Sequence, residues 1–90
     1  MPGPAIRTGL DTAGGVIQSA SGTKVFVEGF QIGVAGDPVD PHGSAPHDGA
    51  VMVGGSSKVF IQGIPALRGG IDQASCGHVS SSSSKVIIGP

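Results

Sequence analysis

Four side chains of this 90-residue chain are able to ligate a soft metal ion or to act as nucleophile and base. They are the three histidines and the single cysteine, arranged in two pairs: His42 with His47, and Cys76 with His78. One thiolate and three imidazoles fill a tetrahedral zinc site. Because this spacing matches no zinc-finger pattern, a metal site is predicted only if the fold brings the two pairs together.

Three other interpretations remain open at this point. The histidines can be solvated loop residues, with Cys76 a small apolar one. Cys76 and His78 can form a nucleophile and base, but such catalysis needs an orienting third group and an oxyanion pocket, for which so small a domain has little room. In a small zinc hydrolase, Asp40 or Asp48 would act as the base, yet four protein ligands would leave no place for an activated water.

Internal repetition indicates how the two pairs are positioned. One string occurs three times, as GTKVFVEGF (22–30), SSKVFIQGI (56–64) and SSKVIIGP (83–90). A second occurs as PAIRTGLD (4–11) and PALRGGID (65–72), with a degraded copy, QIGVAGD, at 31–37. We therefore predict one domain over residues 1–90, built from three units at approximately 4–29, 30–63 and 64–90.

The repeated strings predict an all-β fold. Residues 24–28 alternate around β-branched and aromatic side chains, which is typical of a strand, and recurrent Gly and Pro argue against helices. The pairs Glu28-Gly29 and Gln62-Gly63 are two-residue turns that close hairpins. The third unit ends where its turn should be, so we expect its strand to pair with the amino-terminal segment. Three hairpins would then form a small ring with pseudo-threefold symmetry.

The loops of this ring bring the candidate ligands to one end. They run over residues 11–24, 37–58 and 72–85, at the end opposite the turns and termini. The middle loop carries His42 and His47, and the third carries Cys76 and His78. All four side chains should therefore converge at one apex, where a metal would staple a glycine-rich chain that has little core material.

Composition restricts the partners and the location. The net charge is −1 and no Lys/Arg cluster occurs, which argues against nucleic acid and against stable membrane anchoring. A single cysteine excludes an internal disulfide. The amino-terminal segment lacks a cationic start followed by an apolar run, so we expect cytoplasmic synthesis without a signal peptide.

Several further residues recur at equivalent positions of the units. We expect the apolar residues Phe26, Phe60 and Ile87 to be core, with an apolar contact at the base as the alternative. We expect Arg7 and Arg68 to make salt bridges or hydrogen bonds, and Asp11, Asp37 and Asp72 to cap backbone amides. We interpret the serine run 80–84 as a turn at the apex.

The motifs resemble those of the PAAR-repeat proteins. The strings PAIR (4–7) and PALR (65–68) are similar to the Pro-Ala-Ala-Arg motif that names the family. The first continues as Thr-Gly-Leu-Asp and the second as Gly-Gly-Ile-Asp. The resemblance covers essentially the whole chain, although the middle unit lacks both the proline and the arginine.

This resemblance implies a metal-stapled cone that caps a trimeric β-helical spike, one tip per trimer, in type VI secretion systems or contractile phage tails. It implies a non-enzymatic structural tip that pierces target membranes and is delivered outside or into the target cell. It also makes His42, His47, Cys76 and His78 the ligands of one Zn²⁺ per chain, with iron as the alternative metal. The residues expected at the base against the spike are Glu28, Gly29, Gln62, Gly63, Gly89 and Pro90. An adaptor that loads a separate effector toxin onto the spike is the alternative function.

Overall fold

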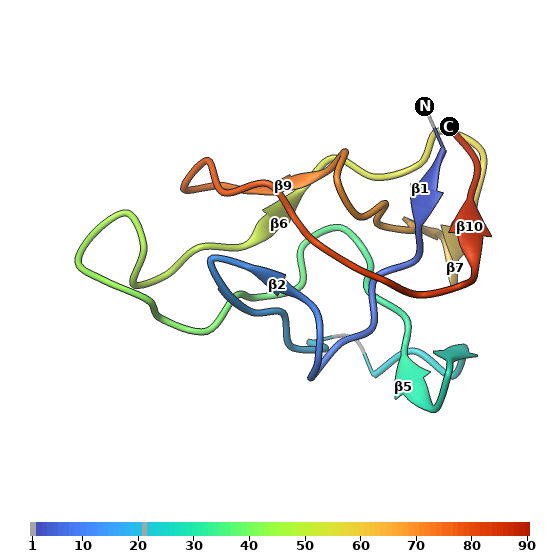
Figure 1. The fold of residues 1–90 in the computed structure, drawn as a ribbon, viewed down its shortest axis with the longest axis horizontal. Coiled ribbons are helices and arrows are strands. Elements are labelled where there is room, and N and C mark those ends of the chain that lie inside the picture. The colour runs from blue at the N-terminus through green and yellow to red at the C-terminus, as the bar shows by residue number, and fades with distance from the viewer. Residues whose placement is uncertain (1, 21) are drawn as a thin grey trace.

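A computed structural model describes residues 2–20 and 22–90. The described residues contain ten strands of two residues each and no helix, so none of them forms a helix that is able to cross a membrane. The strands are β1 (Gly3–Pro4), β2 (Thr12–Ala13), β3 (Gly15–Val16), β4 (Phe26–Val27), β5 (Phe30–Gln31), β6 (Met52–Val53), β7 (Phe60–Ile61), β8 (Ile64–Pro65), β9 (Gln73–Ala74) and β10 (Ile87–Ile88). The predicted all-β class is confirmed (Figure 1).

The predicted hairpins and the pairing of the two chain ends are present. Strands β4 and β5 pair antiparallel around the Glu28-Gly29 turn, and β7 and β8 pair around Gln62-Gly63. Strand β10 pairs antiparallel with β1, with Gly3 opposite Ile88. Figure 1 accordingly places β1 and β10, the first and last strands, side by side at one end of the molecule.

Backbone bonds connect the three predicted units in a cycle. Each unit donates to the next through an equivalent amide: Thr8 N to Gln31 O at 2.9 Å, Ala35 N to Pro65 O at 2.9 Å, and Gly69 N to Pro4 O at 2.7 Å. Isolated bridges follow the same cycle, pairing Arg7 with Ile32, Val34 with Ala66, and Ala5 with Arg68. A ring of three related units would give this pattern, while the pseudo-threefold rotation itself stays a prediction.

Equivalent positions of the three predicted units contribute to the core. Ile6 and Leu67 occupy equivalent positions and are fully buried, and Gly33 stands at the third. A Cβ at Gly33 would lie 2.7 Å from Ile6 Cγ2 and 3.3 Å from Leu67 Cδ1, so two large side chains fill the space and the third position must be small. One buried cluster extends from here into the loops and includes Ile17, Met52 and Ala74.

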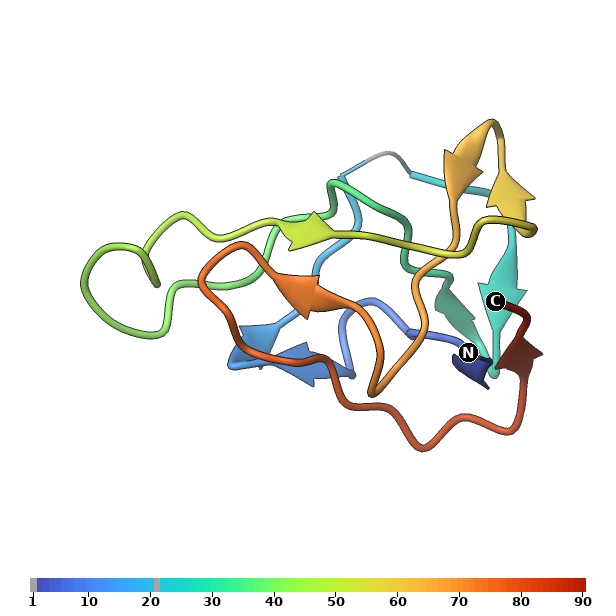
Figure 2. The same cartoon turned by 90° about the horizontal axis from the view of Figure 1, so that it is seen from above.

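The loops extend from the ring on the side away from the termini. The chain measures 32 × 24 × 23 Å, and its long axis runs from the termini to the loop over residues 41–49. Figure 2, seen from above, places the β2–β3 hairpin and the turn after β9 beside that loop. Strand β6, which follows that loop, pairs antiparallel with β9, which precedes the turn, and Met52 lies opposite Ala74.

Two expectations from the sequence are wrong. Phe26, Phe60 and Ile87 are not core, because 60%, 53% and 62% of their surfaces are exposed. The segment 80–84 is not an apex turn: it runs in an extended form beside the amino-terminal segment, where Ser81 bridges Thr12 and the Ser82 and Ser84 hydroxyls donate to Ala5 O. The polar side chains there replace the ladder bonds that longer strands would supply.

Candidate metal centre

The three histidines and the cysteine meet at the loop end of the molecule. Each of these residues offers one potential ligand atom, and the four atoms all lie within 4.8 Å of one another; the residues are His42, His47, Cys76 and His78. His42 Nε2 is the common neighbour, 3.3 Å from His47 Nδ1, 3.0 Å from His78 Nδ1 and 3.5 Å from Cys76 Sγ. Cys76 Sγ and His78 Nδ1 are 3.7 Å apart.

These spacings are those of a tetrahedral site. Nitrogen ligands at about 2.05 Å and a sulfur ligand at about 2.3 Å from one ion would lie about 3.3 Å apart for two nitrogens and about 3.6 Å for nitrogen and sulfur. The observed N–N separations of 3.0 and 3.3 Å are at or slightly below the first value, and the N–S separations of 3.5 and 3.7 Å lie on either side of the second. The donor set therefore fits a single ion.

The middle loop orients its two histidines through its own backbone. The other ring nitrogen of His42, Nδ1, lies 2.9 Å from the Asp40 carbonyl oxygen, so Nε2 is the nitrogen that is available to bind a metal. The amide of His42 donates to His47 O at 3.1 Å, and the amide of His47 donates to Ser44 O at 2.9 Å. A closed turn thus holds both rings toward the same point.

The third loop is held against the middle one. The turn after β9 is closed by Ala74 N donating to His78 O at 2.8 Å and by Gly77 N donating to Ala74 O at 2.9 Å. The Ser75 amide donates to Val51 O at 2.7 Å, which ties this turn to the strand that follows the histidine loop. Cys76 packs against the buried cluster of the core, so the thiol is anchored on the interior rather than on a free loop.

The geometry does not favour the catalytic interpretations. His78 Nδ1, which lies 3.7 Å from the Cys76 thiol, is closer still to His42 Nε2, at 3.0 Å, so it points into the cluster and not toward a substrate. Asp40 meets the cluster through its carbonyl, while its carboxylate accepts a hydrogen bond from Gln18 Nε2 at 3.0 Å. A carboxylate used in this way is a poor candidate for the general base of a hydrolase.

The repeated arginines pair with the repeated aspartates. The Arg68 guanidinium donates to both carboxylate oxygens of Asp72, at 3.1 and 2.8 Å, and Arg7 makes the same contacts with Asp11, at 2.9 and 2.8 Å. Each aspartate also accepts the backbone amide of its own arginine. The expected salt bridges and amide caps are both confirmed.

Burial and hydrogen bonding act in opposite directions on these carboxylates. Burial alone would raise the pKa of Asp72, but hydrogen bonds from the Arg68 side chain and from the Gly55 and Arg68 amides lower the pKa below its usual value. Burial opposes the Arg7 and Ser82 hydrogen bonds in the same way at Asp11, whose pKa is also lowered.

The middle unit keeps the aspartate without the arginine. Val34 occupies the arginine position and is buried, and its amide donates to Asp37 Oδ2 at 2.9 Å. Burial raises the pKa of Asp37, and the amide bonds from Val34 and Ala20 offset this only in part. The cap survives in all three units, whereas the ion pair is found in two.

The residues expected at the base lie at the end opposite the cluster. Glu28 and Gly29 form the β4–β5 turn, Gln62 and Gly63 form the β7–β8 turn, and Gly89 and Pro90 follow β10. The Glu28 carboxylate is engaged within the chain, because it accepts from Arg7 Nη1 at 2.8 Å and from the Lys85 amide at 2.9 Å.

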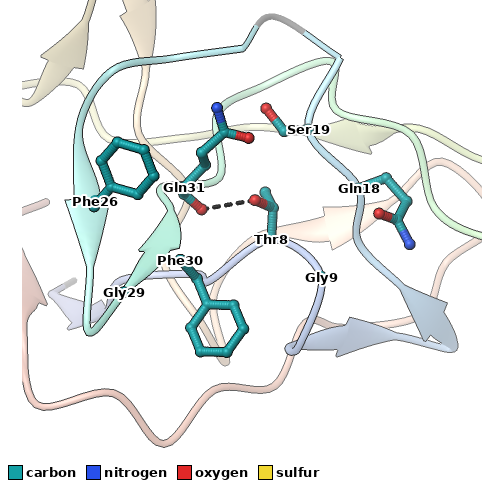
Figure 3. A pocket seen from close by; sticks show the side chains of 8 residues that line it. All are labelled: Thr8, Gly9, Gln18, Ser19, Phe26, Gly29, Phe30 and Gln31. Atoms are coloured by element: carbon teal, nitrogen blue, oxygen red, sulfur yellow. Dashed lines mark hydrogen bonds between the residues drawn. The ribbon is translucent and has the colours of Figure 1, made fainter.

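A pocket of about 390 Å³ opens on the flank of the β4–β5 hairpin and contains none of the candidate ligands (Figure 3). The rings of Phe26 and Phe30 lie beside it, and the Thr8 hydroxyl donates to Gln31 O across its floor at 2.7 Å. Its lining is Thr8, Gly9, Gln18, Ser19, Phe26, Gly29, Phe30 and Gln31. The pocket therefore adjoins one of the residues expected at the base, Gly29, and not the candidate metal centre.

A comparison with protein families now connects the site with the sequence motifs. Residues 10–79 match the PAAR motif, a span that includes all four candidate ligands. The chain belongs to the PAAR motif family. A search among curated proteins found no match. The PAAR family is structural rather than enzymatic and is associated with spike-tip proteins of type VI secretion, and in this PAAR chain the His/Cys cluster is able to bind a metal ion.

Proposed function

We propose that this PAAR protein is a zinc-stapled tip that caps a trimeric β-helical spike of a contractile injection machine, either a type VI secretion system or a phage-like tail. In this proposal the loop end is the point that meets the target membrane, and the end with the termini is the base. The protein would be made in the cytoplasm and delivered with the spike.

Zinc is the metal that suits the cluster best. A donor set of three imidazoles and one thiolate is borderline-soft, and its tetrahedral spacing matches a d¹⁰ ion that has no other geometric preference. Four protein donors fill such a site, so the ion would be structural. It would join the middle loop to the third loop, in addition to the β6–β9 pair and the hydrogen bond from the Ser75 amide to Val51 O.

The base carries the observation on which the docking proposal rests. Phe26, Phe60 and Ile87 hold equivalent positions in the three units, as the first residues of β4, β7 and β10, and all three are more than half exposed. Exposed apolar side chains of this size mark an interaction surface. Three related apolar contacts at one end suit a partner with threefold symmetry, since each partner chain then meets a similar contact.

The exposed backbone at this end supports the same partner. In the pairs β4–β5, β7–β8 and β1–β10, the strands β5, β8 and β1 already accept backbone bonds from the neighbouring unit, so the other strands, β4, β7 and β10, are the edges that would extend a strand of the spike by β-addition. Main-chain hydrogen bonds would then fix how the strands of the tip align with those of the spike, and the apolar residues would strengthen the binding.

Co-purification with a trimeric β-helical spike protein tests the proposal, with one arm using a type VI spike and another a phage central spike. We expect one PAAR chain per trimer by light scattering after size exclusion. The double variant Phe26→Glu/Phe60→Glu should lose the complex, while Leu10→Glu, which changes an exposed apolar residue away from these turns, should keep it. Equal binding by both variants, or no complex with either spike, would refute the docking role.

A further inference from the structure

The metal centre is contacted by a loop that supplies no ligand. Gly14, at the turn between β2 and β3, has a φ of +89°. A Cβ built on Gly14 would collide with His78 Nδ1 and would lie 2.6 Å from His42 Nε2. These are two of the four candidate ligand atoms, so the bare backbone of the first loop lies directly against the metal centre.

The neighbouring glycine allows the same close approach. A Cβ on Gly15 would collide with the Asp40 carbonyl oxygen, and it would lie 3.1 Å from His42 Nδ1. That carbonyl is the group that orients the His42 ring. The hairpin therefore touches both the ligand atoms and the contact that positions one of them.

The β2–β3 hairpin has little freedom to move away. Ala13 is fully buried in the same core cluster against which Cys76 packs. The Val16 carbonyl accepts from the Asp40 amide at 2.8 Å, and Thr12 exchanges backbone hydrogen bonds with Ser81. Bonds to both the middle and the third loop thus clamp the hairpin, so a side chain at position 14 would displace the ligands rather than the wall.

We propose that Gly14 is a positioning residue that lets the first loop close the metal site on the side of His42 and His78. This inference rests on the proposed metal site and extends it: the middle and third units supply the ligands, and the first supplies a wall. A structural site is distinguished from a catalytic one by the absence of an open coordination position. The wall keeps the site at four ligands and excludes water or a fifth donor.

The variant Gly14→Ala tests the wall, and the matched control is Gly36→Ala. Gly36 has nearly the same φ, +92°, so alanine would be similarly strained at either position, but a Cβ at Gly36 meets nothing within 4 Å. Both variants should lose similar stability in the chelated state. In zinc, Gly14→Ala should bind at least tenfold more weakly than wild type, while Gly36→Ala should retain wild-type affinity and one metal per chain. Equal zinc affinity in the two variants would overturn the proposal.

Cobalt spectroscopy provides a readout that general destabilisation does not change. Co²⁺-loaded wild type should show the intense visible bands of a tetrahedral site, unchanged by added azide, because the wall excludes a fifth ligand. Azide-dependent bands in wild type would overturn the proposal, and this arm decides alone should Gly14→Ala not fold. Wild type that binds neither metal would instead refute the metal centre itself, a result distinct from failure of the wall.

Discussion

At the scale of single residues, the three aspartates perform one task in two electrostatic settings. Asp11 and Asp72 cap an amide and bind an arginine, whereas Asp37 caps amides with no arginine at the equivalent position. At Asp37, burial outweighs the amide hydrogen bonds and the pKa is raised, whereas at Asp72 the added hydrogen bonds from the Arg68 guanidinium outweigh burial and the pKa is lowered. The chain therefore contains its own comparison of a cap with and without an ion pair.

Neutralising the two kinds of aspartate should have different consequences. Asp72→Asn leaves the Arg68 guanidinium without its carboxylate and should cost about 2 kcal/mol of unfolding free energy at neutral pH. Asp37→Asn removes a buried charge as well as one acceptor, and it should cost about 1 kcal/mol or less. Urea unfolding of the zinc-loaded proteins measures both values. A larger loss for Asp37→Asn would contradict this explanation.

The difference in unfolding free energy between wild type and each variant should depend on pH, with opposite sign for Asp37→Asn and Asp72→Asn. The pKa of Asp37 is raised in the folded state, so wild type gains stability relative to Asp37→Asn as the pH falls through that folded pKa. The pKa of Asp72 is lowered, so its contribution is complete above the unfolded value near 4 and is lost as the pH falls toward the folded pKa. Comparing each variant with wild type at the same pH isolates the contribution of the substituted aspartate. Parallel pH profiles for the two pairs would contradict these assignments.

Residue types predicted the cluster but not the exposure of the apolar residues. The repeat placed His42, His47, Cys76 and His78 on loops at one end, where the structure brings them together. Alternation failed for Phe26, because the segment Val25-Phe26-Val27 is apolar on both faces. A pattern with two apolar faces does not indicate which one is buried, and Val27 is the buried residue.

At the scale of elements, the fold consists of hairpin turns and backbone bonds rather than long strands. The turns at Glu28-Gly29 and Gln62-Gly63 each place a non-glycine residue at positive φ, +53° for Glu28 and +52° for Gln62. Asn or Gly is preferred at that position of such turns. The Glu28 carboxylate compensates by bonding to Arg7 and to the Lys85 amide, which ties the β4–β5 turn to the strand segment before β10.

Replacing each turn residue by asparagine should separate turn strain from this connection. Gln62→Asn should raise the unfolding free energy by about 0.5 kcal/mol, because asparagine tolerates the left-handed conformation better. Glu28→Asn relieves the same strain but removes the contacts with Arg7 and Lys85, so it should be less stable than wild type. Chemical unfolding checks both, with Glu28→Gln as the control that keeps the side-chain length. Stabilisation by both asparagine variants would mean that the Glu28 contacts contribute nothing.

The turns and the pairing of the chain ends were predictable from the sequence, but the course of the serine run was not. An X-Gly pair between two strand patterns has a local cause, whereas residues 80–84 are placed by contacts with distant partners. Ser82 and Ser84 both donate to Ala5 O, more than seventy positions away. A tract of serines has no local preference that would reveal such contacts.

At the scale of the whole molecule, the candidate metal centre and the proposed base are at opposite ends of a long axis of 32 Å. The ten strands have two residues each, and the largest fully buried side chains are Ile6, Ile17, Met52 and Leu67, together with several smaller residues. Such a domain gains limited stability from its core. Two of the three loops would be joined by the metal, at the end that is proposed to bear force.

Removing the metal should therefore weaken the whole fold and not only the loop end. Because structural zinc contributes folding free energy directly, we expect purified protein to contain about one metal per chain and to lose thermal stability on chelation. Each 1 kcal/mol shifts Tm by about 4–8 °C in a domain of this size, so a loss of only about 3 kcal/mol would lower Tm by roughly 12–24 °C. Zinc added back should restore the original Tm, and calorimetry measures each step.

Cys76→Ser should resemble the chelated wild type, and chelator should lower its Tm only slightly further, because the variant already lacks the ligand that packs on the core. Wild type that unfolds at the same temperature with and without metal would show that the ring and its turns are sufficient for stability.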